Sequence, residues 1–120
     1  MSDDGKTWHE VCSLDEIGDP GAFGFKTMAG EHPVFGFVVQ KNGQVYGYKN
    51  SCPHAGRPLD WAPHAFLTKT KEHIMCSAHG AMFELENGLC VGGPCLGRSL
   101  APWNVEVRDN TIYAEPPPVW

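Results

Sequence analysis

The chain has 120 residues, among them 14 Gly and 10 Pro, and a formal net charge of −5 at pH 7. A chain of this length fits one domain that can bury a core without disulfides, and its Gly and Pro content favours strands and turns over long helices. The nine Lys and Arg residues form no basic block that could neutralise phosphates, so we expect no nucleic-acid partner.

The sequence carries no recognisable export or membrane signal. Residues 2–6 are polar, no apolar segment or twin arginine follows them, and no apolar run approaches the length of a transmembrane helix. The five cysteines, an odd number, argue against a disulfide framework. We therefore expect a soluble cytoplasmic protein with no membrane partner.

The first elements are predicted to be short. Residues 8–12 alternate as an opening strand with Cys12 in the core, and Ser13 and Glu16 then stand at the spacing of a capping box. The following Gly18-Asp19-Pro20-Gly21 limits the helix to a single turn. A second strand is expected around residues 23–26.

A β-hairpin is predicted next. Residues 34–39 and 45–48 are rich in β-branched and aromatic side chains, and Asn42-Gly43 lies between them. Asn-Gly tolerates positive φ at both positions and is a strong hairpin signal. This hairpin delivers the chain to Cys52.

The second half of the chain reads as further short strands. Residues 66–67, 74–75 and 82–85 are expected to be strands, and a turn at residues 86–88 leads to a return strand at 89–91. Residues 92–97 are predicted to be a loop. The class expected for the whole chain is therefore all-β.

The C-terminal part is predicted to form one more hairpin and a tail. Residues 103–108 alternate in polarity, turn at 109–110 and return as 111–114, which indicates a half-buried hairpin. The proline-rich tail, 115–120, is expected to run as polyproline II.

Two short boxes concentrate metal-binding side chains, Cys52-Pro53-His54 and Cys76-Ser77-Ala78-His79, with 21 residues between His54 and Cys76. Two thiolates and two imidazoles form a four-point set for zinc or for an iron–sulfur cluster. Zinc fingers commonly separate paired ligands by two to four residues and bring the second pair in on a helix. Here Pro53 alone separates the first pair, and a predicted strand follows the second.

The boxes resemble those of the Rieske family of [2Fe–2S] proteins, in which two His replace two Cys on one iron. The resemblance runs from about Val34 to Ala114 and includes Cys52-Pro53-His54-Ala55-Gly56, Cys76-Ser77-Ala78-His79-Gly80 and Gly92-Gly93-Pro94. It implies an antiparallel β-sandwich base with a small cluster-binding subdomain at about residues 50–100, within a single domain of residues 1–120. It further implies one [2Fe–2S] cluster per chain, with Cys52 and Cys76 on one iron and His54 and His79 on the other.

The chain has two more His and two more Cys residues near the boxes that are alternative ligands. His64 and His73 lie in a spacer somewhat longer than is usual for the family and are expected to be exposed loop residues, since neither is at box spacing. Cys90 and Cys95 form the alternative thiol pair, with no histidine close in sequence. Leu59 and Trp61 are expected to be apolar cover for the site.

The resemblance favours the low-potential branch, which includes the ferredoxins that supply electrons to oxygenases. The high-potential branch has a serine and a tyrosine where this chain has Ala81 and Phe83, and a disulfide where it has Arg57 and Ala78. The expected function is therefore a one-electron carrier, not an enzyme and with no catalytic residue, that passes electrons from a reductase to an oxygenase-type acceptor. A small subunit or regulatory module of a larger oxidoreductase is the alternative, and a structural zinc domain the third.

Overall fold

The structure is a computed structural model that describes residues 8–29, 31–51, 59–60, 64–76, 80–93 and 96–116. Short antiparallel strands dominate these residues, and the one helix among them is a single turn, which confirms the all-β class. The elements in chain order are β1 His9–Ser13, α1 Leu14–Ile17, β2 Gly21–Ala29, β3 His32–Lys41, β4 Gln44–Lys49, β5 His73–Met75, β6 Met82–Glu84, β7 Cys90–Gly92, β8 Val105–Arg108 and β9 Thr111–Ala114.

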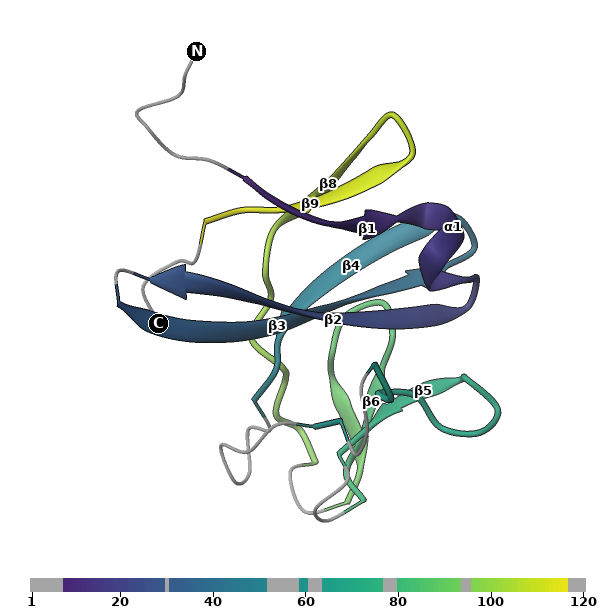
Figure 1. Cartoon of the computed structure of the whole chain (residues 1–120). Coiled ribbons are helices and arrows are strands. Elements are labelled where there is room, and N and C mark those ends of the chain that lie inside the picture. The colour runs from purple at the N-terminus through teal and green to yellow at the C-terminus, as the bar shows by residue number, and fades with distance from the viewer. Residues whose placement is uncertain are drawn as a thin grey trace.

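The strands form three antiparallel sheets in the orders β1-β9-β8, β2-β3-β4 and β5-β6-β7. In Figure 1 the first sheet lies above the second, and β5 and β6 lie below it. The first two sheets form the sandwich base, and the third forms the small subdomain that the family resemblance implied. Among the described residues, no helix is long and apolar enough to cross a membrane.

The N-terminal elements follow the sequence closely. Ser13 Oγ accepts a hydrogen bond from Glu16 N at 3.2 Å, and Glu16 Oε1 accepts one from Ser13 N at 2.9 Å, which completes the predicted capping box. The helix ends at Gly18 after one turn. Cys12 is buried, as expected, and burial raises the pKa of its thiol to about 11, so this thiol is protonated at neutral pH.

The Asn-Gly hairpin is confirmed, with β3 and β4 as its strands. Asn42 and Gly43 have φ of 54° and 78°, the positive values that a two-residue turn of this kind needs. The Asp19 carboxylate accepts hydrogen bonds from both of their N–H groups at 2.8 Å. Strand β2 is longer than predicted because every residue of Gly21–Ala29 pairs with β3.

Trp103 joins the two sheets of the base. Its N–H donates to Gly47 O at 2.8 Å, and its indole Nε1 donates to Glu115 O at 2.7 Å. Its ring packs edge-on against Phe25 and leaves no room for a side chain on Gly36, where a Cβ would come within 2.7 Å of the indole. The prediction of a strand from residue 103 was therefore wrong at its start, since Trp103 precedes β8 and bonds to β4.

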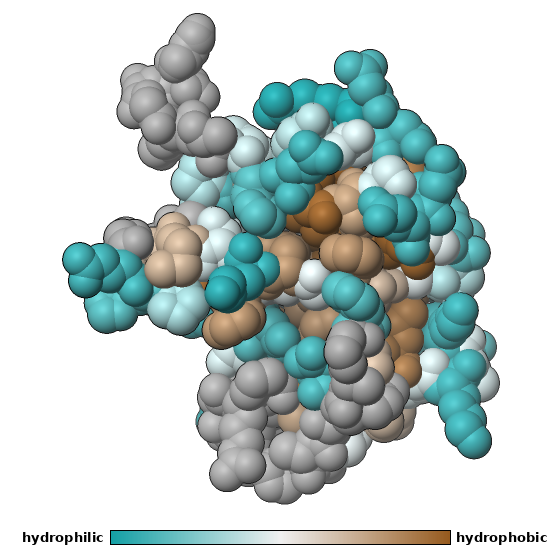
Figure 2. All heavy atoms as spheres, viewed as in Figure 1, coloured by the Kyte–Doolittle hydropathy of each residue, from teal (hydrophilic) through white to brown (hydrophobic). Residues whose placement is uncertain are grey.

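A second apolar core joins the base to the small subdomain. Phe37 and Tyr48 from the base share it with Phe83 and Leu85, and all four side chains are buried. On the face of the molecule seen in Figure 2, apolar residues lie in the middle and hydrophilic residues lie along the upper and right margins. The Tyr48 hydroxyl donates to Leu85 O at 2.7 Å. Burial raises the pKa of Tyr48, so this hydroxyl keeps its proton and remains a donor.

An ion pair at the surface joins the same two parts. Lys41 Nζ, at the end of β3, lies 2.6 Å from Glu86 Oε2 in the turn after β6. This hydrogen bond raises the pKa of Lys41 and lowers that of Glu86. Both side chains are exposed, so the pair adds little stability.

The buried hydroxyl gives a first prediction. Tyr48→Phe removes the donor from the buried Leu85 carbonyl and should lower the free energy of unfolding by about 1–3 kcal/mol. The shift in urea unfolding of the purified protein measures this. The matched control is Tyr46→Phe in the same strand, which should change stability by less than about 0.5 kcal/mol. Equal effects of the two variants would contradict a role for the Tyr48 hydroxyl.

Candidate metal centre

Of the four predicted ligands, the structure describes Cys76. It directly follows β5, and its side chain is fully buried in the core shared with the base. Cys52, His54 and His79 lie outside the described residues, as do Trp61 and Cys95. The geometry available for the site is therefore that of Cys76 and of the residues at the roots of the predicted ligand loops.

The second box spans the connection between β5 and β6, and its two ends are bonded to each other. Cys76 N donates to Ala81 O at 2.8 Å, and Gly80 N donates to Cys76 O at 2.9 Å. The ladder continues below them with the pair Met75 and Met82. Backbone hydrogen bonds thus fix the ends of the segment that contains His79.

The first box follows β4, and a side chain joins the ends of its segment. Asn50 N donates to Phe35 O at 2.9 Å, which attaches this residue to β3. Asn50 Oδ1 accepts from Leu59 N at 2.7 Å, and Asn50 Nδ2 donates to Asp60 Oδ1 at 3.0 Å. Leu59, expected as apolar cover, is fully buried in the shared core.

The loop predicted at residues 92–97 starts one residue later in the structure, because Gly92 is the last residue of β7. Gly93 has φ of 89°, and a Cβ at this position would lie 2.7 Å from the Cα of Ala81. The backbone of Gly93 therefore packs directly on that of Ala81, two residues after the second box, in a contact that requires glycine. The contact places Gly93 beside the end of the connection between β5 and β6.

The alternative ligands that the structure describes occupy ordinary structural positions. His64 is exposed, as expected, but its Nδ1 accepts from Gly24 N at 2.9 Å and its ring stacks on Phe23 with centroids 4.0 Å apart. His73 was wrongly placed in a loop, because it pairs with Glu84 in the β5–β6 ladder and is half-buried. Cys90 is buried, with its Sγ 3.1 Å from Gly92 O.

These positions bear on the metal. Within the part of the chain that the structure describes, no three His, Cys, Asp or Glu side chains are grouped so that they could hold a metal ion. The Nδ1 lone pair of His64 is already used by the Gly24 N–H.

The short strand predicted at residues 66–67 is reduced to an isolated bridge between Leu67 and Ile74.

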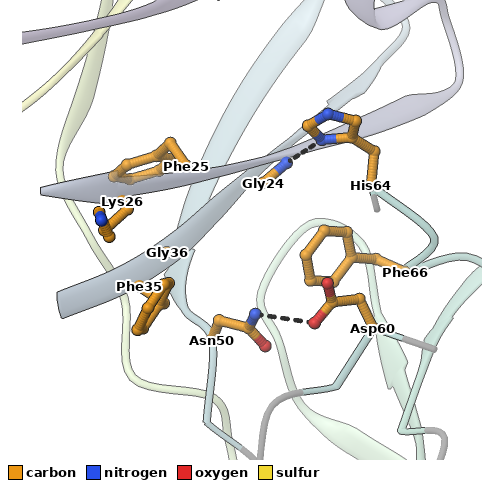
Figure 3. Close-up of a pocket in the computed structure, with 9 residues that line it drawn as sticks. All are labelled: Gly24, Phe25, Lys26, Phe35, Gly36, Asn50, Asp60, His64 and Phe66. Carbon is orange, nitrogen blue, oxygen red and sulfur yellow. Dashed lines mark hydrogen bonds between the residues drawn. The ribbon is translucent and has the colours of Figure 1, made fainter. Parts of the chain in front are cut away.

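A recess of about 260 Å³ lies beside the root of the first box (Figure 3). Gly24, Lys26 and Phe35 from the β2–β3 hairpin line it on one side, and Asn50 and Asp60 line it on the other. Sequence reasoning did not single out Asn50, because its two partners are set by the fold and leave no local pattern.

Comparison with known proteins identifies a family and related structures. The family model of the Rieske [2Fe-2S] domain matches residues 7–109. The ferredoxin of carbazole 1,9a-dioxygenase from Nocardioides aromaticivorans IC177 matches with a TM-score of 0.66 at 23% identity, over 92% of this chain and 99% of that one. The Sphingomonas yanoikuyae B1 ferredoxin matches with a TM-score of 0.67 at 18% identity, over 92% of this chain and 100% of that one.

A larger protein contains a similar fold. The terminal oxygenase of carbazole 1,9a-dioxygenase from Novosphingobium sp. KA1 matches with a TM-score of 0.69 at 19% identity, over 89% of this chain and 29% of that one. No curated protein sequence matches the chain. At these identities, the structural matches show a shared fold.

The described residues fit a cluster of this type. A thiolate suits iron, and the Cys76 side chain is held away from bulk solvent, where a metal–sulfur bond is protected. The backbone bond between Cys76 and Ala81 and the contact of Gly93 with Ala81 hold residue 93 beside the end of the second box.

The glycine contact gives a second prediction. Gly93→Ala and Gly97→Ala both place a side chain at positive φ, with φ of 89° and 88°, and each should cost about 1–2 kcal/mol for the backbone. A Cβ at residue 97 meets nothing within 4 Å, whereas a Cβ at residue 93 meets the Ala81 backbone. Gly93→Ala should therefore lower stability by roughly a further 1–3 kcal/mol in urea unfolding. Equal losses would refute the contact.

Proposed function

Because the chain belongs to the Rieske [2Fe–2S] domain family, we propose that it is a one-electron carrier and not an enzyme. Membership of this family means that the chain binds a Rieske-type [2Fe–2S] cluster. The observation that supports a carrier most is the family match itself, over residues 7–109. We further propose that residues 1–120 act as one domain.

The proposed ligands are Cys52 and Cys76 on one iron and His54 and His79 on the other. The chemistry of the two boxes supports this set, as does the position of Cys76 at the root of a loop with bonded ends. When bound, the cluster accepts and releases one electron. The chain's own part is to supply two thiolates and two neutral imidazoles, to exclude water from Cys76 and to hold the loops at their ends.

The imidazoles set the charge of the site. With two ferric ions, two sulfides and two thiolates, the formal charge of the centre is zero, whereas four thiolates would make it more negative by two. A neutral centre accepts an electron more easily. Ala81 and Phe83 supply no hydroxyl near this centre, so we propose a potential toward the lower end of the Rieske range.

We propose that a reductase is the donor and an oxygenase-type protein the acceptor, in the cytoplasm. The likeness to the ferredoxin of carbazole 1,9a-dioxygenase supports this pairing, and a net charge of −5 suits docking against a basic surface. The second candidate is a subunit or module of a larger oxidoreductase, which the likeness to a terminal oxygenase favours. Gel filtration with candidate partners separates the two, because a free carrier should not co-elute in stoichiometric amounts.

The ligand set gives a third prediction. His54→Ala and His79→Ala should each abolish normal cluster assembly, because an iron loses one of its protein ligands. His64→Ala and His73→Ala are the matched controls and should retain the visible absorption and the full iron and sulfide content. Loss of the cluster in a control variant, or a wild-type protein that holds zinc and no iron, would reject the assignment.

The potential gives a fourth prediction. Ala81 and Phe83 are fully buried, so a hydroxyl added there must find an acceptor, and the cluster sulfur is the one we propose. Such a bond is worth about 1.5–3 kcal/mol to a charged acceptor, and the midpoint rises by the part of this energy that stabilises the reduced cluster more than the oxidised one. Since a tenfold change in a one-electron equilibrium is about 59 mV, Ala81→Ser with Phe83→Tyr should raise the midpoint by on the order of 100 mV.

Redox titration measures this shift. Ala114→Ser is the matched control, because Ala114 is equally buried but lies in β9, in the separate apolar core around Trp103. It should leave the midpoint unchanged. A wild-type midpoint well above zero would contradict the low-potential proposal.

A further inference from the structure

We propose that Asn50 is a positioning residue that closes the loop carrying Cys52 and His54. The inference rests on the ligand set of the proposed function. It concerns the described residues on either side of that loop, residues 49–51 and 59–60, and the hydrogen bonds between them.

The Asn50 side chain, on one side of the loop, bonds to two residues on the other side. Its Oδ1 accepts from Leu59 N at 2.7 Å, and its Nδ2 donates to Asp60 Oδ1 at 3.0 Å. Figure 3 shows the second of these bonds at the edge of the recess. Asn50 itself is fixed to the base, because its own N–H donates to Phe35 O at 2.9 Å. Both ends of segment 51–58 are therefore attached to β3 and β4 through a single residue.

The far end of the loop is anchored as well. Leu59 is fully buried in the core that the base shares with the small subdomain, and Cys76 belongs to the same core. Fixing the ends of a segment removes much of the conformational entropy that it would otherwise lose on binding a metal. The Asn50 bonds thus hold the first ligand loop in register with the second.

The two ligand loops are closed by different groups. In the second box, the backbone of Cys76 and Ala81 makes the closing bond, so any side chain is compatible with it. In the first box, the closing group is a side chain that must accept on one atom and donate on the other. An amide does both, whereas a carboxylate accepts only. The donor side faces the Asp60 carboxylate, so an acid at position 50 would place two carboxylates together.

This requirement can be tested by exchanging the amide and the carboxylate between positions 50 and 60. Asn50→Asp keeps the acceptor for Leu59 N and loses the donor to Asp60. Combining it with Asp60→Asn restores a donor and acceptor pair with its direction reversed, at the net charge of the wild type. Restoration by the double variant would show that the bond matters, because a nonspecific effect of changing residue 50 would persist.

The chain also contains a matched control. Asn87 makes the same two kinds of bond in the β6–β7 turn, where its Nδ2 donates to Glu84 Oε1 at 2.9 Å and its Oδ1 accepts from Leu89 N at 2.8 Å. Asn87→Asp makes the same chemical change, beside an acid, in a turn that carries no proposed ligand. It therefore reports what the same change costs at an exposed site away from the proposed ligands.

The experiment measures the rate at which visible absorption is lost when the purified cluster-containing protein is mixed with an iron chelator. Asn50→Asp should lose its cluster faster by on the order of tenfold, as expected for one broken charge-assisted bond. The double variant should return to within about twofold of the wild type. Asn87→Asp should lose its cluster at the wild-type rate. The electron-spin spectrum of the reduced Asn50→Asp protein should broaden, and that of the double variant should not.

A wild-type rate in Asn50→Asp, no recovery in the double variant, or an equal acceleration in Asn87→Asp would each overturn the proposal. Its failure is distinct from failure of the ligand set. If His54→Ala lacks the cluster while Asn50→Asp behaves as the wild type, the positioning role alone is wrong. If His54→Ala retains a normal cluster, the ligand set is wrong and the positioning role falls with it.

Discussion

The apolar core between sheet β2-β3-β4 and sheet β5-β6-β7 is the constraint on which the site depends. Phe37 and Tyr48 from the base pack there with Phe83 from β6, and the predicted ligand Cys76 is a member of the same core. The bond from Tyr48 to Leu85 adds a fixed direction to a contact that is otherwise nonspecific. The second ligand loop is therefore positioned by burial of its own root.

Each loop root near the site is secured by a different interaction. Backbone hydrogen bonds join Cys76 to Ala81, the Asn50 side chain bonds to Leu59 and Asp60, and the Gly93 backbone packs on Ala81. All three interactions are made by residues at the ends of short strands or of loops, where the backbone forms few regular hydrogen bonds. A cluster bound by two separate segments needs such interactions, because its geometry depends on how the segments are held relative to each other.

Local signals in the sequence were sufficient to predict much of the fold. Asn42-Gly43 predicted its hairpin and Ser13 with Glu16 predicted the capping box, since both patterns act through neighbouring backbone groups. Tertiary contacts decided the rest. Trp103 leaves the predicted strand to bond Gly47, and His73 joins the β5–β6 ladder. At the site, the types and spacing of the Cys and His residues and the family resemblance predicted the two boxes, but no local pattern could reveal that Asn50 bonds to Leu59 and Asp60 across the first of them.

The ligand set is the central claim, and pulsed electron-spin spectroscopy of the reduced protein, labelled with nitrogen-15 in its histidines, tests it most directly. The account predicts a mixed-ligand [2Fe–2S] signal with strong coupling to two imidazole nitrogens, one from His54 and one from His79. A reduced cluster with no histidine nitrogen coupling, or a protein that contains zinc in place of iron, would contradict it.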